Sequence, residues 1–280
     1  MQIAIATNTL AGNGKAVMLA EKIHGILTDR KITSHVFTEK QWDDRLYDFD
    51  QVWIAGGDGT VNYFVNQYNN IKIPLCIFNG GTGNDFHALL YGKTTVEEQV
   101  EHVLQSTPKP IDAGKCNERY FLNGVGIGFD GAVAKSLQGV NKWGGKTSFM
   151  IAVLKHIFFY KEQHYTITSA EKTTAGKYMI ISIANGTRYG GGFFVAPVAK
   201  PDDGLFDAVL AKPLSIFKRL KYLPVIEKGK HLGLPFINYY NTQKITVKSN
   251  QPIQSHLDGE YLESNELNIE ILPAHFNFIF

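Results

Sequence analysis

The chain has 280 residues, of which 44% are hydrophobic and 19% charged, and its formal net charge at pH 7 is +2. This composition is that of a folded globular protein rather than a disordered one, and the length favours two domains over a single hydrophobic core. A net charge this close to zero gives no strong positive field, so we expect no nucleic-acid partner.

Two cysteines occur, Cys76 and Cys116, and both lie in apolar, strand-like surroundings. Neither has a Cys or His at metal-ligand spacing, so we expect buried, reduced thiols in a cytoplasmic protein. The N-terminus starts directly with a strand pattern and lacks the basic region of a signal peptide. The longest apolar stretch, 149–160, is interrupted by Lys155 and His156 and is too short to span a bilayer.

The first half of the chain alternates strand and helix patterns. Strands are expected at 3–6, 32–37, 52–55 and 73–78, and helices over 17–27, over 61–68, after Asn84 and over 95–105. In the last of these helices, Thr95 and Glu98 have the spacing of a capping box. The alternation predicts a parallel sheet covered by helices on both faces, in a Rossmann-like or phosphofructokinase-like α/β domain over 1–115.

After about Asp112 the pattern changes to short strands bounded by Gly, Asn, Asp or Pro. They are expected at 120–127, 165–169, 178–184, 206–211, 244–248, 253–257 and 267–271, with two helical stretches at 147–160 and 213–228. This pattern predicts a mostly antiparallel β domain, a β-sandwich, over 116–271. For the last residues, about 272–280, a return of the chain to the first domain stays open.

The most informative motif is Gly56-Gly57-Asp58-Gly59-Thr60-Val61-Asn62, which follows an apolar strand and opens a helix. Ligands of open α/β sheets bind at such strand ends, and a helix N-terminus presents N–H groups to phosphate. The glycines let the backbone approach a ligand closely. Asp58 is a hard oxygen ligand that suits Mg²⁺ on a nucleotide. The alternative is an ordinary glycine-rich surface turn.

A second glycine turn follows the next strand, with the sequence Asn79-Gly80-Gly81-Thr82-Gly83-Asn84-Asp85-Phe86. Thr82 offers a hydroxyl group, Asn84 an amide and Asp85 a second carboxylate. Alone, such a turn is a weak signal, because paired glycines are common in turns. Two turns at neighbouring strand ends can hold one nucleotide between them, and we therefore interpret the pair as a nucleotide-binding site.

At this pair of turns the sequence resembles the diacylglycerol kinase catalytic-domain family, which includes soluble bacterial diacylglycerol kinases and sphingosine kinases and is related to NAD kinases. The resemblance runs through nearly the whole chain and implies nucleotide contacts at Gly56–Asn62 and Thr82. The family's early phosphate loop corresponds to Asn8-Thr9-Leu10-Ala11-Gly12, which lacks the family's proline. Thr38 falls where the family has a nucleotide-contacting threonine, although the usual Gly-His-Ala does not follow it.

The resemblance also implies a structural Mg²⁺ site in the β domain, within the motif at 196–207. Its ligands would be the Asp203 carboxylate and the main-chain oxygens of Lys200 and Leu205. The residues alone favour a β-turn at Pro-Asp-Asp-Gly, and both interpretations can hold. A further glycine-rich segment, 123–130, is interpreted as close packing of backbone against backbone or ligand.

The last motif is Leu257-Asp258-Gly259-Glu260, which looks like the family's Asp-Gly-Glu. The resemblance implies that Glu260 is the general base. Asp-Gly between two strand patterns is also a good hairpin turn, which places Glu260 at a strand end. Because phosphoryl transfer has a loose transition state, positioning the attacking hydroxyl matters more than basicity.

Residues 212–230 interleave lysines and Arg219 with apolar residues, in a helix that Pro213 can begin and Gly229 can end. This pattern suits a helix lying on an anionic membrane. The alternative is an ordinary helix packed on the β domain.

The expected function is that of an ATP-dependent lipid kinase with ATP and Mg²⁺ as cofactors. Glu260 and Asp58 would be catalytic, and the favoured acceptor is diacylglycerol, which would give phosphatidic acid. Two alternatives stay open: an NAD kinase-like small-molecule kinase, and a non-catalytic regulatory protein that binds nucleotide or lipid. We expect a cytoplasmic protein in peripheral contact with a membrane, and strand pairing through the β domain could form a homodimer.

Overall fold

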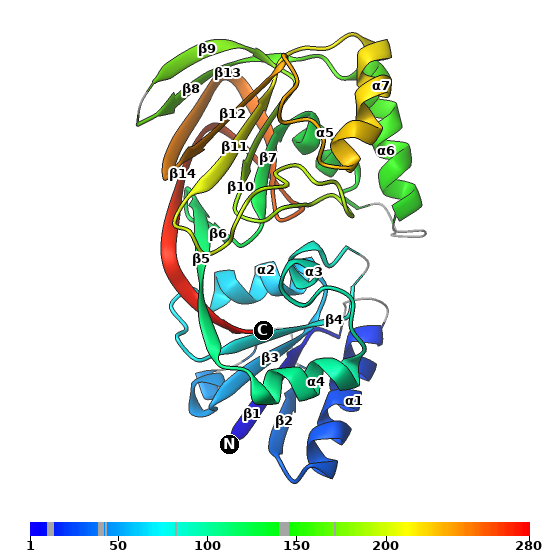
Figure 1. The fold of residues 1–280 in the computed structure, drawn as a ribbon, viewed down its shortest axis with the longest axis vertical. Helices are drawn as coiled ribbons and strands as arrows, with labels where there is room; N and C mark the ends of the chain where they lie inside the picture. The colour runs from blue at the N-terminus through cyan, green and yellow to red at the C-terminus, as the bar shows by residue number, and fades with distance from the viewer. Residues whose placement is uncertain (10–13, 39–41, 43, 82, 140–145, 171) are drawn as a thin grey trace. The chain divides into compact units, whose positions relative to one another are not determined.

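The structure is a computed structural model that describes the chain except for residues 10–13, 39–41, 43, 82, 140–145 and 171 (Figure 1). It divides into two compact units. The first comprises Met1–Ile111 and Ala274–Phe280, and the second comprises Asp112–Pro273. The first is an α/β unit with parallel strands and the second is mostly antiparallel β structure, which confirms the predicted fold class.

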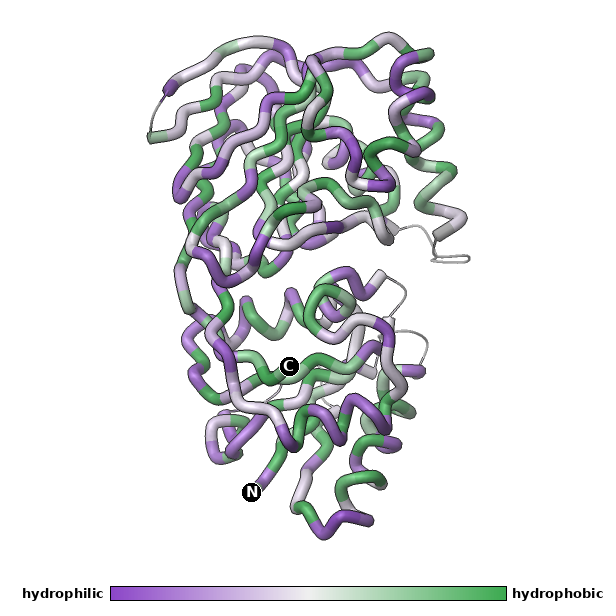
Figure 2. The backbone as a smooth tube through the Cα atoms, viewed as in Figure 1, coloured by the Kyte–Doolittle hydropathy of each residue, from purple (hydrophilic) through white to green (hydrophobic). Residues whose placement is uncertain are grey.

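The first unit is built on a parallel sheet with the strand order β4-β3-β1-β2. The strands are β1 (Gln2–Thr7), β2 (Thr33–Phe37), β3 (Gln51–Gly56) and β4 (Leu75–Asn79). β1, β3 and β4 are continuous apolar runs because helices cover both of their faces, and Figure 2 shows them as largely apolar. The C-terminal segment adds to this sheet, where Phe278 pairs in parallel with Leu75.

Helices pack on both faces of this sheet (Figure 1). They are α1 (Lys15–Asp29), α2 (Asp58–Gln67), α3 (Asp85–Tyr91) and α4 (Val96–Gln105), with a 3₁₀ helix at Asp44–Asp48. α1 and α4 pack together in one apolar core, in which Ile23 and Val100 are completely buried. The predicted capping box of α4 is confirmed: the Glu98 N–H donates to Thr95 Oγ1 at 3.2 Å, and the Thr95 N–H donates to Glu98 Oε2 at 2.9 Å.

The second unit has the strand order β12-β11-β10-β7-β13-β14, in which each pair is antiparallel. The strands along the chain are β5 (Pro108–Cys116), β6 (Arg119–Phe121), β7 (Gly124–Gly128), β8 (Gln163–Ser169), β9 (Thr173–Tyr178), β10 (Ile180–Ala184), β11 (Phe206–Ala211), β12 (Ile237–Thr242), β13 (Lys244–Leu257) and β14 (Glu260–Ile279). β13 is irregular between Lys248 and Ile253. The part before this irregularity pairs with the β8–β9 hairpin and the part after it pairs with β7. One strand thereby serves two layers around a shared apolar core.

Three helices accompany these strands: α5 (Phe129–Ser136), α6 (Lys146–Phe159) and α7 (Ile216–Glu227). The sequence analysis predicted α6 and α7 but missed α5. With eight residues, α5 is too short for its periodicity to stand out after a glycine-rich strand. Gly131 within it is required by close packing, because a Cβ there would lie 2.1 Å from the Gln254 carbonyl oxygen.

Two details of the prediction for 212–230 are wrong. Pro213 does not begin the helix, which starts at Ile216 after Ser215 in an extended N-cap conformation. Arg219 was counted among the cations of the membrane-binding pattern, but its side chain is buried. The predicted helix end is confirmed, because Gly229 directly follows the C-cap residue and has a φ of 67°.

Both cysteines, Cys76 and Cys116, are buried and free, as predicted. Burial raises the pKa of each thiol to about 12, so neither is a reactive thiolate. Among the described residues, no helix is long and apolar enough to cross a membrane.

Candidate functional site

The predicted nucleotide-binding residues of the first unit lie at the carboxyl ends of its parallel strands. Asn8 follows β1, Thr38 follows β2, and the two glycine turns follow β3 and β4. Because parallel strands end at the same edge of a sheet, these four segments share one edge of the unit. Two of the predicted contacts, Gly12 and Thr82, lie outside the described residues.

The two glycine turns are in direct backbone contact. The Gly80 N–H donates to the Gly56 carbonyl oxygen at 2.8 Å. A Cβ placed on Gly81 would lie 2.5 Å from the Gly57 Cα, and a Cβ on Gly57 would lie 2.9 Å from the Gly81 Cα. No side chain fits at either position, since real Cβ atoms do not approach backbone this closely. The glycines are therefore required for the turns to meet.

Asn84 supports the second turn from within. Its side chain accepts a hydrogen bond from the Gly81 N–H at 3.2 Å and donates to the Gly81 carbonyl oxygen at 2.6 Å. Asn84 has a φ of 52°, a left-handed conformation that Asn tolerates better than most residues. Asn84 therefore has a structural role in the second turn, and the predicted nucleotide contact would be a second role.

Asp58 links the two turns. It is the first residue of α2, and its Oδ2 accepts a hydrogen bond from the Asp85 N–H, at the start of α3, at 3.1 Å. The pKa of the Asp58 carboxyl is raised to about 6, chiefly by burial and also by the neighbouring negative charge of Asp85, although hydrogen bonds from backbone N–H groups oppose the rise. A carboxylate held in this way at a strand end is typical of functional sites.

Two of the remaining residues of the first motif, Thr60 and Val61, have packing roles. Thr60 and Val61 are buried, and Thr60 packs so tightly under Gly56 that a Cβ on this glycine would lie 2.5 Å from the Thr60 Cβ. Gly59 is exposed, and the Asn62 carbonyl oxygen accepts a hydrogen bond from the Asn66 side chain at 2.8 Å.

In the second unit, Asp258 and Gly259 form the turn between β13 and β14. Their φ values of 49° and 90° are both positive, as in a two-residue type I′ hairpin, and confirm the predicted turn. The Asp258 carboxylate accepts three backbone hydrogen bonds, from Leu122 at 2.8 Å and from Asn123 and Gly124 at 2.9 Å each.

Glu260, the predicted general base, is the first residue of β14 and is exposed. Its backbone position is fixed from two sides. It pairs with Leu257 across the hairpin, and the turn that precedes it is held by the three hydrogen bonds to Asp258. An exposed carboxylate on a rigid backbone can meet a ligand without rearrangement of the chain.

The structure also brings together a cluster that the sequence analysis did not single out. Asp130, in the first turn of α5, accepts a hydrogen bond from the Tyr189 hydroxyl at 2.9 Å, and the Tyr189 ring packs edge-on against His256 with centroids 5.0 Å apart. Burial raises the pKa of Asp130 to about 6 and lowers the pKa of His256 to about 4. In the sequence, Phe129-Asp130 at the end of the glycine-rich segment could have drawn attention to Asp130. Its hydrogen-bond partner Tyr189, however, is distant in sequence.

The loop that contains the predicted structural metal ligands is a turn, as the residues alone indicated. Asp203 Oδ1 accepts a hydrogen bond from the Leu205 N–H at 3.1 Å, and Asp112 Oδ2 accepts one from the Gly204 N–H at 2.7 Å. Burial raises the pKa of nearby Asp207, and the charge of Asp203 contributes to the rise. Three carboxylates thus gather at this turn, while Lys200 is exposed. Within the described residues, no group of three or more His, Cys, Asp or Glu side chains is arranged as a metal site.

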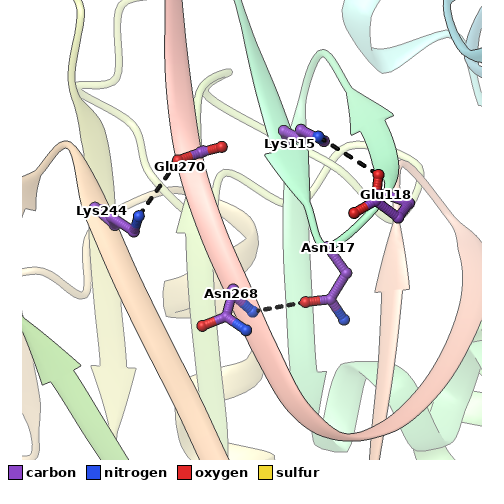
Figure 3. Close-up of a pocket in the computed structure, with 6 residues that line it drawn as sticks. All are labelled: Lys115, Asn117, Glu118, Lys244, Asn268 and Glu270. Carbon is purple, nitrogen blue, oxygen red and sulfur yellow. Dashed lines mark hydrogen bonds and ion pairs between the residues drawn. The ribbon is translucent and has the colours of Figure 1, made fainter.

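A polar depression on the second unit is not a comparable candidate (Figure 3). Its charged groups pair with one another: Lys115 Nζ lies 3.6 Å from Glu118 Oε2, and Lys244 Nζ lies 3.5 Å from Glu270 Oε2. The strands β5, β13 and β14 and the turn between β5 and β6 supply its lining, which is Lys115, Asn117, Glu118, Lys244, Asn268 and Glu270.

An α/β unit with paired glycine turns at its strand ends, joined in one chain to an antiparallel β unit, defines a two-domain kinase architecture. The diacylglycerol kinase catalytic domain model matches residues 2–116, and the model of the YegS C-terminal NAD kinase beta sandwich-like domain matches residues 123–280. The chain belongs to the diacylglycerol kinase catalytic-domain family, whose relatives are lipid kinase-type phosphotransferases.

Individual relatives agree with this assignment. The chain is 27% identical over 235 residues to a probable YegS-like lipid kinase of Shewanella frigidimarina, a match that covers 82% of this chain and 76% of the relative. It is 29% identical over 235 residues to a protein of Staphylococcus haemolyticus assigned as a lipid kinase, covering 81% of this chain and 75% of the relative.

Two solved structures share the fold. One, from Bacillus anthracis, is assigned as a diacylglycerol kinase and matches with a TM-score of 0.81 at 23% identity, covering 100% of this chain and 95% of the other. The second is an NAD kinase from Archaeoglobus fulgidus in complex with ATP, with a TM-score of 0.58 at 15% identity, covering 100% of this chain and 94% of the other.

Proposed function

We propose that this protein transfers the γ-phosphoryl group of Mg-ATP to the hydroxyl group of a lipid, with diacylglycerol as the acceptor and phosphatidic acid as the product. The observation that carries the proposal is the direct contact of the two glycine turns, with Asp58 of one turn accepting the N–H of Asp85 in the other. Family membership supports the reaction class.

The residues of the first unit fit a nucleoside triphosphate. Contact between Gly57 and Gly81 brings the two turns together at the strand ends, where ligands of open α/β sheets bind. Gly57 caps α2 without a side-chain hydrogen bond, and the Thr60 N–H donates to the Gly57 carbonyl oxygen at 2.9 Å. The N-terminus of α2 ahead of Thr60 favours an anion. In this proposal the nucleotide contacts are those predicted from the sequence: Asn8, Gly12, Thr38, Gly56, Gly57, Asp58, Gly59, Thr60, Val61, Asn62, Thr82, Asn84 and Asp85.

The carboxylates of this edge fit a magnesium ion. Asp58 and Asp85 are hard oxygen donors close enough for the charge of one to raise the pKa of the other. Bound Mg²⁺ neutralises charge on the transferred phosphoryl group. Asp58 and Asp85 would hold the ion or its water ligands, and the ion would in turn stabilise the ionised form of Asp58.

The acceptor hydroxyl is assigned to Glu260 of the second unit. Its carboxylate would accept a hydrogen bond from the hydroxyl and take up the proton as the bond to phosphorus forms. The turn held by Asp258 positions Glu260 for this role. The loop with Asp203 and the carbonyl oxygens of Lys200 and Leu205 is proposed as a separate structural Mg²⁺ site, because hard oxygen donors gather there around a tight turn.

The test is transfer of labelled γ-phosphate from Mg-ATP to diacylglycerol in mixed micelles, with NAD as a parallel acceptor because an NAD kinase shares the fold. We expect label in the lipid, with the transfer rate lowered by about a hundredfold or more in Glu260→Gln. A matched control is Glu118→Gln, which changes an exposed glutamate of the same unit. Label in NAD alone would assign the protein to the nucleotide kinases, and ATP binding without any transfer would indicate a non-catalytic protein.

A further inference from the structure

The two helices α6 and α7 of the second unit leave an unusual amount of apolar surface exposed. On α6, Ile151, Leu154 and Phe158 are exposed and recur at the three- and four-residue spacing of one helix face, and Phe159 is 75% exposed. The opposite side of the helix, with Val153 and Ile157, is buried in the core. Figure 2 shows the backbone of α6 coloured largely as apolar residues.

α7 repeats this arrangement. Phe217 is 85% exposed, the largest exposed fraction among the exposed large apolar side chains of the described residues, and Ile216 and Leu220 are exposed beside it. Leu223 and Ile226 pack inward against the loop that carries Tyr189. α6 and α7 pack on each other, and Figure 1 shows them side by side on one side of this unit.

Arg219 fastens the two helices together. Its guanidinium group donates to the carbonyl oxygens of Ile157 and Tyr160 at 3.0 Å each, at the C-terminal end of α6. It also donates to Glu162 Oε1 at 2.6 Å, and its Nε donates to the Leu214 carbonyl oxygen at 2.9 Å. Carbonyl groups at a helix C-terminus attract a cation, and this buried arginine thereby joins α7 to the end of α6.

The charged side chains around the exposed apolar residues are almost all positive. Lys221 lies one helical turn after Phe217, and Lys155 lies one turn after Ile151, so each is beside an apolar stripe and both are exposed. Lys161, just beyond α6, and Lys212, Lys218, Lys228 and Lys230, on or beside α7, are exposed as well. With Glu162 paired to Arg219, Glu227 is the remaining acid within 151–162 and 212–230.

We propose that this surface, formed by the outer faces of α6 and α7, docks the protein on an anionic lipid bilayer. Exposed aromatic and aliphatic side chains would enter the region between headgroups and acyl chains, and the flanking lysines would contact lipid phosphates. The choice of a bilayer over a protein partner rests on the proposed function, whose acceptor lies in a membrane. The apolar patch with a lysine-rich border fits an anionic surface by charge and by hydrophobicity.

The test is flotation of the full chain with vesicles of phosphatidylcholine alone and of phosphatidylcholine with phosphatidylserine. We expect binding to the anionic vesicles, weakened about tenfold by Phe217→Ser because an exposed phenylalanine no longer enters the lipid. The matched control is Met18→Ser, which removes a 74% exposed apolar side chain from a helix of the other unit. Lys221→Glu should weaken binding to anionic vesicles about tenfold, whereas Lys177→Glu, an equal charge change on an exposed strand, should not.

Docking and catalysis are separable in this design. Phosphoryl transfer to a short-chain diacylglycerol dispersed as monomers should be unchanged in Phe217→Ser and Lys221→Glu, since neither residue belongs to the proposed catalytic machinery. Binding without any transfer would overturn the proposed function and leave the docking surface standing. Equal vesicle binding by Phe217→Ser and Met18→Ser would overturn the docking proposal, and so would self-association of the wild type that Phe217→Ser abolishes in the absence of vesicles.

Discussion

Replacing Asp58 by asparagine should stabilise the nucleotide-free protein and at the same time lower the rate of phosphoryl transfer. Burial raises the pKa of this carboxyl from 3.8 to about 6, so the ionised form is held in the folded chain against its preference. Asparagine has nearly the same shape, and its side-chain oxygen can still accept the Asp85 N–H that Asp58 accepts at 3.1 Å. The substitution therefore removes the buried charge and keeps the link between the two turns.

The expected magnitude follows from this pKa. A rise of about two units corresponds to at most about 3 kcal/mol of lost stability at pH 7.5, where both folded and unfolded states are ionised. Asp58 is partly exposed and asparagine accepts weaker hydrogen bonds, so we expect a net gain of about 1–2 kcal/mol for Asp58→Asn. As the pH falls from 6 towards 4, the folded wild type takes up a proton before the unfolded chain does. The destabilisation then shrinks, to about half of its value at pH 5.

The measurement is urea unfolding at pH 7.5 and at pH 5, in EDTA and without nucleotide, together with the transfer assay. Asp48→Asn, at an exposed carboxyl of the same unit, is the control and should change stability little at either pH. Transfer by Asp58→Asn should fall by at least about a hundredfold. The reasoning is refuted if Asp58→Asn is less stable than the wild type at pH 7.5, or if the difference between them is the same at both pH values.

Three further substitutions test the geometry. Gly81→Ala should weaken ATP binding about tenfold or more in a calorimetric titration, since its Cβ would lie 2.5 Å from the Gly57 backbone. The control Gly25→Ala, in open space within α1, should instead raise the free energy of unfolding in urea by about 0.5–1 kcal/mol. Asp258→Asn keeps the positive φ but loses an acceptor oxygen, so unfolding free energy should fall by about 2–3 kcal/mol, with a parallel fall in kcat. Asp130→Asn should raise the free energy of unfolding at pH 7.5, because burial raises the pKa of the Asp130 carboxyl to about 6. It should also lower the transfer rate about tenfold or more, and an unchanged transfer rate would leave Asp130 without a functional role.

The sequence predicted the first unit in most of its detail because its elements are specified locally. Apolar runs gave the strands, and Thr95 with Glu98 gave a helix start that the structure confirms. It failed for α5, whose eight residues are too few for a clear periodicity and whose Gly131 is required by a tertiary contact with the Gln254 backbone. The start of α7 was misplaced for a different reason, since Pro213 and Ser215 are both good first residues and sequence alone does not rank them.

For the candidate site, the sequence predicted which turns would matter but not how they meet. That Gly57 and Gly81 touch depends on the parallel pairing of β3 with β4, in which Gly56 pairs with Asn79. The same limit applies to Arg219, whose charge suggested a membrane contact until its partners at the end of α6 were known. A side chain's charge is visible in sequence, whereas its burial is a property of the whole fold.

The two units share one local arrangement. In each, a buried strand leads through a glycine into a helix whose first turn carries an aspartate: Gly57 precedes Asp58 in α2, and Gly128 precedes α5 with Asp130. The helix N-terminus favours the ionised carboxylate and burial opposes it, and burial prevails, since it raises the pKa of both groups to about 6. Neither aspartate is explained by stability alone, because a neutral residue would fold at lower cost. In the proposed function Mg²⁺ would bring a positive charge to Asp58, whereas Asp130 accepts a hydrogen bond from the Tyr189 hydroxyl at 2.9 Å.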